Sequence, residues 1–209
     1  MSFMSFRLFL FSFLFLIIHS LPSAGQTQRC DLKKDKEGIK VYTCPSDTSK
    51  FRSLIAEFVL EDITFVELKI FLWNVDNYVN WQYNMTEATL LKKVDEQSII
   101  YRSEIDAPWP VQNREMIVQL SVNQTLGPDQ LAFSMHTVSI DYPLNKDLTR
   151  VPFSQATWTV NRVKNKLFVT YQLNIDPGGY IPSMLVNLAM AEGPYESFYN
   201  LKKLLAKKK

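Results

Sequence analysis

The sequence has little excess charge of either sign, because 23 lysines and arginines stand against 21 aspartates and glutamates, for a net charge of +2. Proteins that bind nucleic acid usually carry a basic excess or a basic stripe, so this balance argues against a nucleic-acid partner. Histidine and cysteine are scarce as well, with two of each in 209 residues. Such a set makes a zinc site implausible, and we expect neither a bound metal nor a cofactor.

Motifs of several enzyme classes are also missing. The chain has no Gly-x-Ser-x-Gly nucleophile elbow and no Cys-x-x-Cys redox motif, and Gly178-Gly179 lacks the Lys-Ser/Thr continuation of a phosphate-binding loop. After residue 25, His136 is the only histidine. A triad needs a base held against a nucleophile, so we do not expect an enzyme. The alternative is an enzyme for a hydrophobic substrate, with His136 and a carboxylate as its best candidates.

One long apolar run is present, at residues 8–18, and no later run is long enough to span a bilayer. Arg7 precedes it and small residues up to Gly25 follow it, which is the order of a secretory signal peptide. We therefore expect cleavage of residues 1–25, a mature domain at 26–209, and an exported protein, periplasmic or secreted. An uncleaved membrane anchor is the weaker alternative, because a full span takes about 20 apolar residues.

The two cysteines, Cys30 and Cys44, flank a turn signal at residues 35–38. A hairpin centred on Glu37 would set the two side chains opposite each other, close enough for a sulfur bridge. Because an exported chain meets an oxidising compartment, we expect a disulfide rather than two free thiols.

Alternating apolar and polar residues predict strands, and an apolar period of 3.6 residues predicts helices. The expected strands are residues 39–44, 51–60, 88–94, 98–106, 114–122, 131–140, 154–163 and 166–173. We expect Thr64 to cap a helix that reaches Asn74, a short helix at 76–81, and a long final helix kinked at Gly193-Pro194. This order predicts an α+β fold without a parallel sheet.

Four short motifs follow one another along the chain: DNYVNW at 76–81, APWPVQNREMIV at 107–118, SQATWTV at 154–160 and DPGGYIP at 176–182. Together they resemble START domains, the lipid-binding domains of the steroidogenic-acute-regulatory-protein type. The similarity covers roughly residues 32–205 and is greatest to short, stand-alone bacterial START proteins. Glu115 departs from the aspartate that the family commonly has after the arginine, although the charge is kept.

The resemblance implies a helix-grip fold, in which a curved antiparallel sheet surrounds a long C-terminal helix and encloses a tunnel for one lipid molecule. It also implies a lid formed by the last helix and the loop 106–113, and it brings no catalytic residue set. Gly178 and Gly179 join a strand to the last helix and suit a lid hinge. We expect a monomer that binds, and as a further step transfers, a lipid or another hydrophobic small molecule.

The residues expected in the cavity or on its lid are Trp81, Tyr101, Trp109, Arg114, His136, Trp158, Met184 and Leu188. Trp81 and Trp158 fit a core or a tunnel wall. Trp109, between two prolines, fits either an indole exposed to a membrane interface or one packed under the last helix. Arg114 fits a grip on a polar lipid head or, as we prefer, a tie that holds the lid loop through backbone groups or through a carboxylate such as Asp106.

Arg102 and Glu104 share one face of their strand, and we expect that face to be solvated rather than ligand-binding. The basic, amphipathic residues 201–209 are compatible with transient contact with anionic lipid heads. A solvated tail that stabilises the negative end of the helix is the preferred interpretation. A structural or partner-binding domain with a filled interior is the third alternative for the whole chain.

Overall fold

The computed structural model describes residues 30–46, 49–123 and 127–207. The predicted signal peptide lies outside these residues. No helix within these ranges is long and apolar enough to span a membrane. The strands are β1 (Asp31–Lys36), β2 (Ile39–Cys44), β3 (Ser53–Glu61), β4 (Met85–Asp95), β5 (Ser98–Ile105), β6 (Arg114–Asn123), β7 (Gln130–Thr137), β8 (Thr149–Arg150), β9 (Phe153–Val163) and β10 (Lys166–Asp176), and the helices are α1 (Phe65–Trp73), the 3-10 helix η1 (Val75–Asn80), α2 (Ser183–Ala189) and α3 (Glu192–Ala206).

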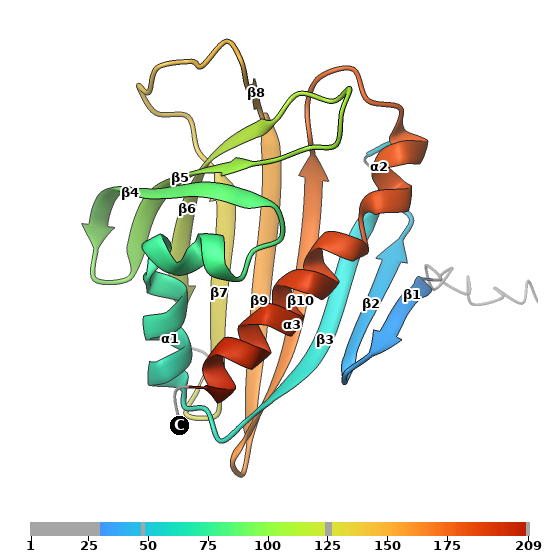
Figure 1. Cartoon of the computed structure of the whole chain (residues 1–209). Helices are drawn as coiled ribbons and strands as arrows, with labels where there is room; N and C mark the ends of the chain where they lie inside the picture. The colour runs from blue at the N-terminus through green and yellow to red at the C-terminus, as the bar shows by residue number, and fades with distance from the viewer. Residues whose placement is uncertain (1–29, 47–48, 124–126, 208–209) are drawn as a thin grey trace, which may run out of the picture.

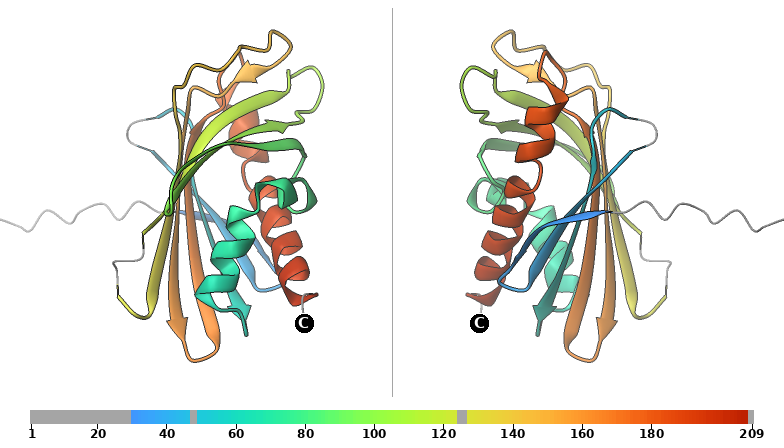
Figure 2. Two further views of the ribbon diagram at one scale, coloured as in Figure 1. Left: turned by 90° about the vertical axis from the view of Figure 1, so that its left-hand side faces the viewer. Right: turned by 90° about the vertical axis from the view of Figure 1, so that its right-hand side faces the viewer.

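The strands form one curved sheet in the order β1-β2-β3-β10-β9-β7-β6-β5-β4, in which all neighbours are antiparallel. The short β8 adds a parallel pairing at the start of β6. Helices α1, η1, α2 and α3 lie on the concave side of the sheet, and α3 runs obliquely across its middle (Figures 1 and 2). The predicted helix-grip α+β fold is therefore confirmed.

Local signals account for several element boundaries. The predicted disulfide joins Cys30 to Cys44 and closes the open end of the β1–β2 hairpin. At the start of α1, the backbone N–H of Glu67 donates to Thr64 Oγ1 at 3.2 Å, and the N–H of Thr64 donates to Glu67 Oε2 at 2.8 Å. This capping box satisfies N–H groups that would otherwise lack a partner at the helix start. The predicted cap is thus confirmed.

The C-terminal segment is two helices rather than one helix kinked at Gly193-Pro194. The break lies at residues 190–191, because α2 ends at Ala189 and α3 begins at Glu192. Pro194 sits in the first turn of α3, where its missing N–H costs nothing. In a continuous helix its ring would clash with the carbonyl group of residue 190, so the helix ends ahead of the proline.

Aromatic rings fill the space between α3 and the centre of the sheet. The Phe198 ring of α3 stacks on Phe58 of β3 at a centroid distance of 4.7 Å. Trp158 and Tyr171 meet the Phe198 ring edge-on at 5.4 and 5.0 Å. Farther along α3, Leu201 and Leu205 continue this buried face. This packing fixes α3 on the sheet along its C-terminal part, while its N-terminal turns border a cavity.

Candidate functional site

A cavity of about 260 Å³ lies between the sheet and the first turns of α3. Strands β5, β6, β7, β9 and β10 form one wall, and residues 81–83 with residues 193–198 form the other. None of the described residues that line it carries a charge. Its aliphatic surface comes from Ile105, Met116, Val118, Met135, Leu173 and Ile175.

Strand alternation decides which side chains reach this cavity, because neighbouring residues on a strand face opposite sides. On β10, Tyr171, Leu173 and Ile175 face it at every second position. On β6, Met116 and Val118 do so, while Glu115 faces the outside. The alternation of side chains along the strands therefore determines which residues line the cavity. A substitution at one of these inward positions changes the cavity wall directly.

The volume limits what the cavity holds in this conformation. Ligand pockets typically measure roughly 300 to 1,000 Å³, and an engineered apolar cavity of about 150 Å³ binds benzene. At about 260 Å³ this cavity has room for a compact apolar molecule or for part of a longer one. A complete long-chain lipid needs more space than this conformation offers.

The polar groups on the wall are uncharged hydrogen-bonding groups. Within the described residues, the hydroxyls of Tyr101 and Tyr171 have no hydrogen-bond partner. Burial raises the pKa of both tyrosines, so both hydroxyls stay protonated and can donate. The indole N–H groups of Trp81 and Trp158 are also buried without a partner among the described residues. The wall thus combines apolar surface with neutral donors.

Three of the predicted cavity residues, Trp81, Tyr101 and Trp158, line the cavity. Two do not reach it. His136 is exposed, because Phe133 is buried and Met135 lines the cavity, which leaves His136 on the outward phase of β7. Its placement in the cavity was therefore wrong.

On α2, the side chain of Met184 is 67 % exposed rather than in the cavity, so that placement was also wrong. Met184 lies one residue after the helix begins at Ser183, on the side of α2 that faces away from the sheet's core. Leu188 belongs to the same helix, but its side chain lies outside the described part of the structure.

The two predicted lid residues have distinct environments. Trp109 lies between Pro108 and Pro110 in the loop 106–113 and is 93 % exposed, so its indole is not packed under the last helix. Arg114 at the head of β6 is buried and donates to the carbonyl groups of Gln112 and Gly178. The preferred interpretation of Arg114 as a backbone tie is correct.

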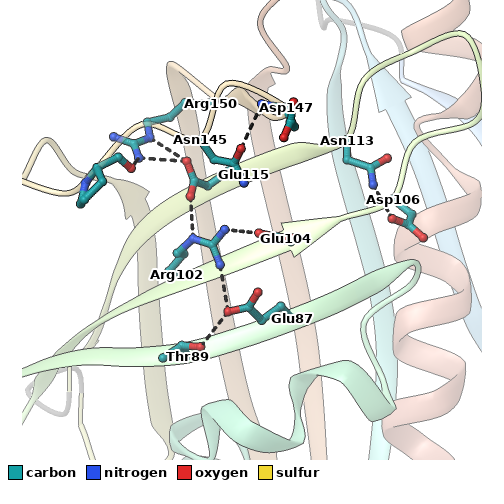
Figure 3. Close-up of polar contacts among 11 residues, drawn as sticks. Glu87, Thr89, Arg102, Glu104, Asp106, Asn113, Glu115, Asn145, Asp147 and Arg150 are labelled. Carbon is teal, nitrogen blue, oxygen red and sulfur yellow. Dashed lines mark hydrogen bonds and ion pairs between the residues drawn. The ribbon is translucent and has the colours of Figure 1, made fainter.

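The suggested carboxylate partner of Arg114 is not used. Asp106 instead accepts a hydrogen bond of 2.6 Å from the side-chain amide of Asn113, within the same loop (Figure 3). Gly178 and Gly179 have φ angles of +68° and +69°, a region that only glycine adopts readily. The two glycines are therefore required by the local backbone.

Several wall residues were missed by the sequence analysis, among them Met116, Tyr171 and Phe198. The signal for Tyr171 was present, because it shares its strand phase with Leu173 and lies directly opposite Trp158 on β9. Phe198 lies on α3 and not on a strand. Counting inward positions along β6 and β10 would have found Met116 and Tyr171.

The outer face of β5 and β6 carries a cluster of charged side chains, shown in Figure 3. Glu115, only 1 % exposed, accepts from Arg102 Nε at 2.5 Å through one oxygen and from Arg150 Nε and Nη2 at 3.0 and 2.9 Å through the other. Arg102 also pairs with Glu87 at 3.0 Å and with Glu104. Arg102 and Glu104 lie on the outer face, but Arg102 and Glu115 are buried there, whereas Glu87 is exposed and Glu104 and Arg150 are partly exposed.

The pKa of Glu115 reflects this environment. Burial alone would raise the pKa of its carboxyl, but hydrogen bonds from Arg102 and Arg150 outweigh that effect and lower the pKa below 4.5. For Arg102, burial would lower the pKa, and hydrogen bonds to Glu115, Glu104 and Glu87 raise it instead. Each of these charges is therefore held ionised by its neighbours.

Comparisons with known proteins agree with this fold. The family model described as "START domain" matches residues 30–207. An uncharacterized protein of Pseudomonas aeruginosa is 28 % identical over 181 residues, which covers 85 % of this chain and 87 % of the relative. The human ceramide transfer protein is 22 % identical over 201 residues, which covers 86 % of this chain but only 32 % of that protein.

Solved structures show the same likeness. A crystal structure of a STAR-related lipid transfer protein from Xanthomonas axonopodis superposes with a TM-score of 0.77 at 28 % identity, covering 85 % of this chain and 98 % of that one. The human StAR-related lipid transfer protein 5 superposes with a TM-score of 0.72 at 15 % identity, covering 85 % and 86 %. The second likeness concerns the fold alone.

Proposed function

The chain belongs to the START domain family, and we propose that it binds a lipid or another hydrophobic small molecule in the cavity beside α3. The family consists mostly of lipid-binding proteins without enzymatic activity. The observation that carries the proposal is the apolar, uncharged cavity of about 260 Å³ between helix and sheet. A domain that served only as a structural unit would gain stability by filling this space.

The chemistry of the wall favours a neutral ligand. Burial of an isolated ionised group costs far more than burial of a neutral one, and no described wall residue offers a countercharge. Tyr101 and Tyr171 can each donate a hydrogen bond, which suits a hydroxyl, ester or amide oxygen. A free carboxylate or a phosphate group inside the cavity would lack an ionic partner.

Transfer between membranes requires enclosure. Each methylene moved out of water is worth about 0.8 kcal/mol, and a bilayer supplies nearly the same gain. A carrier that left the ligand half exposed would lose it to the membrane. We therefore assign the lid to α2 and the N-terminal turns of α3, hinged at Gly178 and Gly179, together with the loop 106–113. A long-chain lipid would enter only when the lid moves away from the sheet.

The lid end of the molecule also offers a membrane contact. The loops at residues 106–113 and 177–182 lie at the end of the sheet opposite the C-terminus (Figure 1). Trp109 and Tyr180 are almost fully exposed on these loops. Both side chains are types that concentrate at membrane interfaces, so a transient contact there would open the lid toward the bilayer.

The structure does not support His136 as a catalytic base in the cavity, which weakens the enzymatic alternative. His136 is exposed on the outer phase of β7, and the tyrosines on the cavity wall have raised pKa values that disfavour them as bases at neutral pH. We also propose that the protein is exported after removal of residues 1–25. The Cys30–Cys44 disulfide supports this, because such bridges persist in oxidising compartments.

Native mass spectrometry of the purified protein tests the binding proposal. We expect an apolar, uncharged adduct at one molecule per chain, identified after solvent extraction. The control is Ala156→Leu, which adds apolar volume on the cavity wall and should abolish the adduct while the fold persists. Absence of any apolar adduct, together with failure of the protein to take up fluorescent neutral lipids, would overturn the proposal.

A further inference from the structure

Three segments that are distant in sequence meet at the lid end of the cavity. They are the end of the loop 106–113, the short strand β8, and the glycine pair Gly178-Gly179. Arg114 lies at their junction, at the head of β6 on the same phase as Met116. Its side chain is only 8 % exposed. Two of these three segments are the parts of the lid named above.

The guanidinium of Arg114 joins the two lid segments directly. Nη1 donates to the carbonyl oxygen of Gln112 in the loop, and Nη2 donates to that of Gly178 at 3.4 Å. Among the described residues, no carboxylate lies within ion-pairing distance of Arg114. Burial without a countercharge leaves these carbonyl groups as its partners, so the charge depends on both segments being in place.

Strand β8 provides a second link between the same two segments. The backbone N–H of Thr149 donates to the carbonyl of Asn113 at 2.9 Å, and Thr149 Oγ1 donates to the side chain of Gln112 at 3.0 Å. The other side of β8 packs against Gly178. A Cβ at Gly178 would lie 2.9 Å from Cδ of Pro152 and 3.3 Å from Cγ2 of Thr149. The hinge therefore packs against Thr149 of β8 and against Pro152, and the contact with Pro152 leaves no room for a Cβ at Gly178.

We propose that Arg114 is a positioning residue that couples the loop 106–113 to the hinge at Gly178, so that the two parts of the lid open together. The inference rests on the lid assignment made under the proposed function. The physical reason is the cost of a partial opening. If one segment left alone, the buried guanidinium would lose one acceptor without gaining water. If both leave, water reaches the guanidinium and replaces both acceptors.

Amide hydrogen exchange of the whole chain, read by mass spectrometry without any ligand, tests this coupling. Gly179→Ala perturbs the hinge through its positive φ angle, because a Cβ there would meet Thr149 Cγ2 only at 3.5 Å, an ordinary contact distance. We expect this substitution to raise exchange at residues 177–184 and also, on the order of tenfold, at residues 106–113. In an Arg114→Met background, the loop should already exchange faster, and Gly179→Ala should add nothing further there.

The matched control is Arg162→Met, which removes an arginine that bonds to Asp129 and to the carbonyl of Pro128 at the opposite end of the sheet. It should leave exchange in both lid segments unchanged. If Arg114→Met does not fold, Arg114→Lys replaces it, since one ammonium group cannot span both carbonyl groups in the geometry of the guanidinium.

Two results would overturn the coupling. In the first, Gly179→Ala speeds exchange at the hinge and leaves residues 106–113 as they are. In the second, the hinge substitution still reaches the loop when Arg114 is absent. Both results are read from the unliganded protein, so they are independent of whether an apolar molecule is bound. Failure of lipid uptake with intact coupling would instead count against the binding proposal alone.

Discussion

Neighbouring residues on β5 and β6 face two opposite environments. On the outer face, Arg102 and Glu115 form a closed ion network with Glu87, Glu104 and Arg150. On the inner face, one residue along each strand, Tyr101 and Met116 border a cavity without charge. The same stretch of backbone therefore carries a fully paired polar layer on one side and an apolar surface with open space on the other.

The contrast indicates that the outer face of β5 and β6 serves stability, whereas the inner face does not. Outside, each charge that is buried has a partner, as burial of charge requires. Inside, a cavity of about 260 Å³ is left unfilled by side chains, and unfilled space in a core lowers stability relative to a filled core. This loss of packing favours a function for the inner face.

The largest expected effect comes from breaking the outer face. Glu115→Gln removes one of the three carboxylate partners of the buried Arg102 and also the carboxylate that pairs with the partly exposed Arg150. Removal of one partner of a buried pair typically costs about 3 to 5 kcal/mol, and because Arg102 keeps Glu87 and Glu104 we expect a loss of about 3 kcal/mol. Chemical denaturation would measure this loss in the free energy of unfolding. As a control, Glu96→Gln removes the exposed partner of Lys93 and should cause no resolvable change. Equal effects of the two substitutions would contradict the assignment of the outer face.

The same carboxylate predicts an acid-sensitive component of stability. The folded-state pKa of Glu115 lies below 4.5, so the unfolded chain takes up this proton first as the pH falls. The contribution is complete above about pH 4.5 and is lost as the pH drops through the folded-state pKa. Denaturation curves between pH 6 and 3 should therefore converge for the wild type and Glu115→Gln. A difference that stayed constant over this range would rule out Glu115 as the titrating group.

A matched pair of alanines compares the hollow part of the inner face with its packed part. Ala56 on β3 is fully buried in the core, whereas Ala156 on β9 lines the cavity. Ala56→Leu overpacks a filled region and should lower the free energy of unfolding by about 1 to 3 kcal/mol. Ala156→Leu enters free space and should cost less than about 0.5 kcal/mol, or stabilise. If thermal melts gave equal losses for both, the cavity would not be open to side chains.

The sequence was sufficient for the layers of the fold and for part of the cavity. Strand alternation and the motif around Trp158 predicted the strands that carry most of the wall, and Thr64 predicted the start of α1. His136 was wrongly placed in the cavity because the prediction relied on the reactivity of histidine rather than on its position in the inward–outward alternation of β7. The buried Phe133 three positions before it already put His136 on the outer side of β7. Local pattern was the better guide there.

The outer cluster could not be predicted for a different reason. Glu115 and Arg150 are 35 residues apart, and β8, which brings them together, has only two residues and therefore no periodic pattern. The break between α2 and α3 was close to its predicted position, because proline acts on the preceding turn rather than on its own. Contacts that short segments make with residues far away in the sequence cannot be predicted from a single sequence.

The smallest effect on stability is expected at Trp109, which belongs to neither face. Its side chain is 93 % exposed on the loop 106–113, so Trp109→Ala should change the free energy of unfolding by less than about 0.5 kcal/mol. If the lid end touches membranes, the loss of one interfacial aromatic should lower association with neutral phosphatidylcholine vesicles about tenfold, since burial of such a side chain is worth roughly 1.5 to 3 kcal/mol. Phe168→Ala, at the opposite end of β10, removes a partly exposed aromatic and should leave vesicle sedimentation unchanged. Equal losses for both variants would mean that vesicle association depends on the total exposed apolar area. A loss confined to Trp109→Ala would identify the lid end as the membrane-contact surface, distinct from the inner face that holds the ligand.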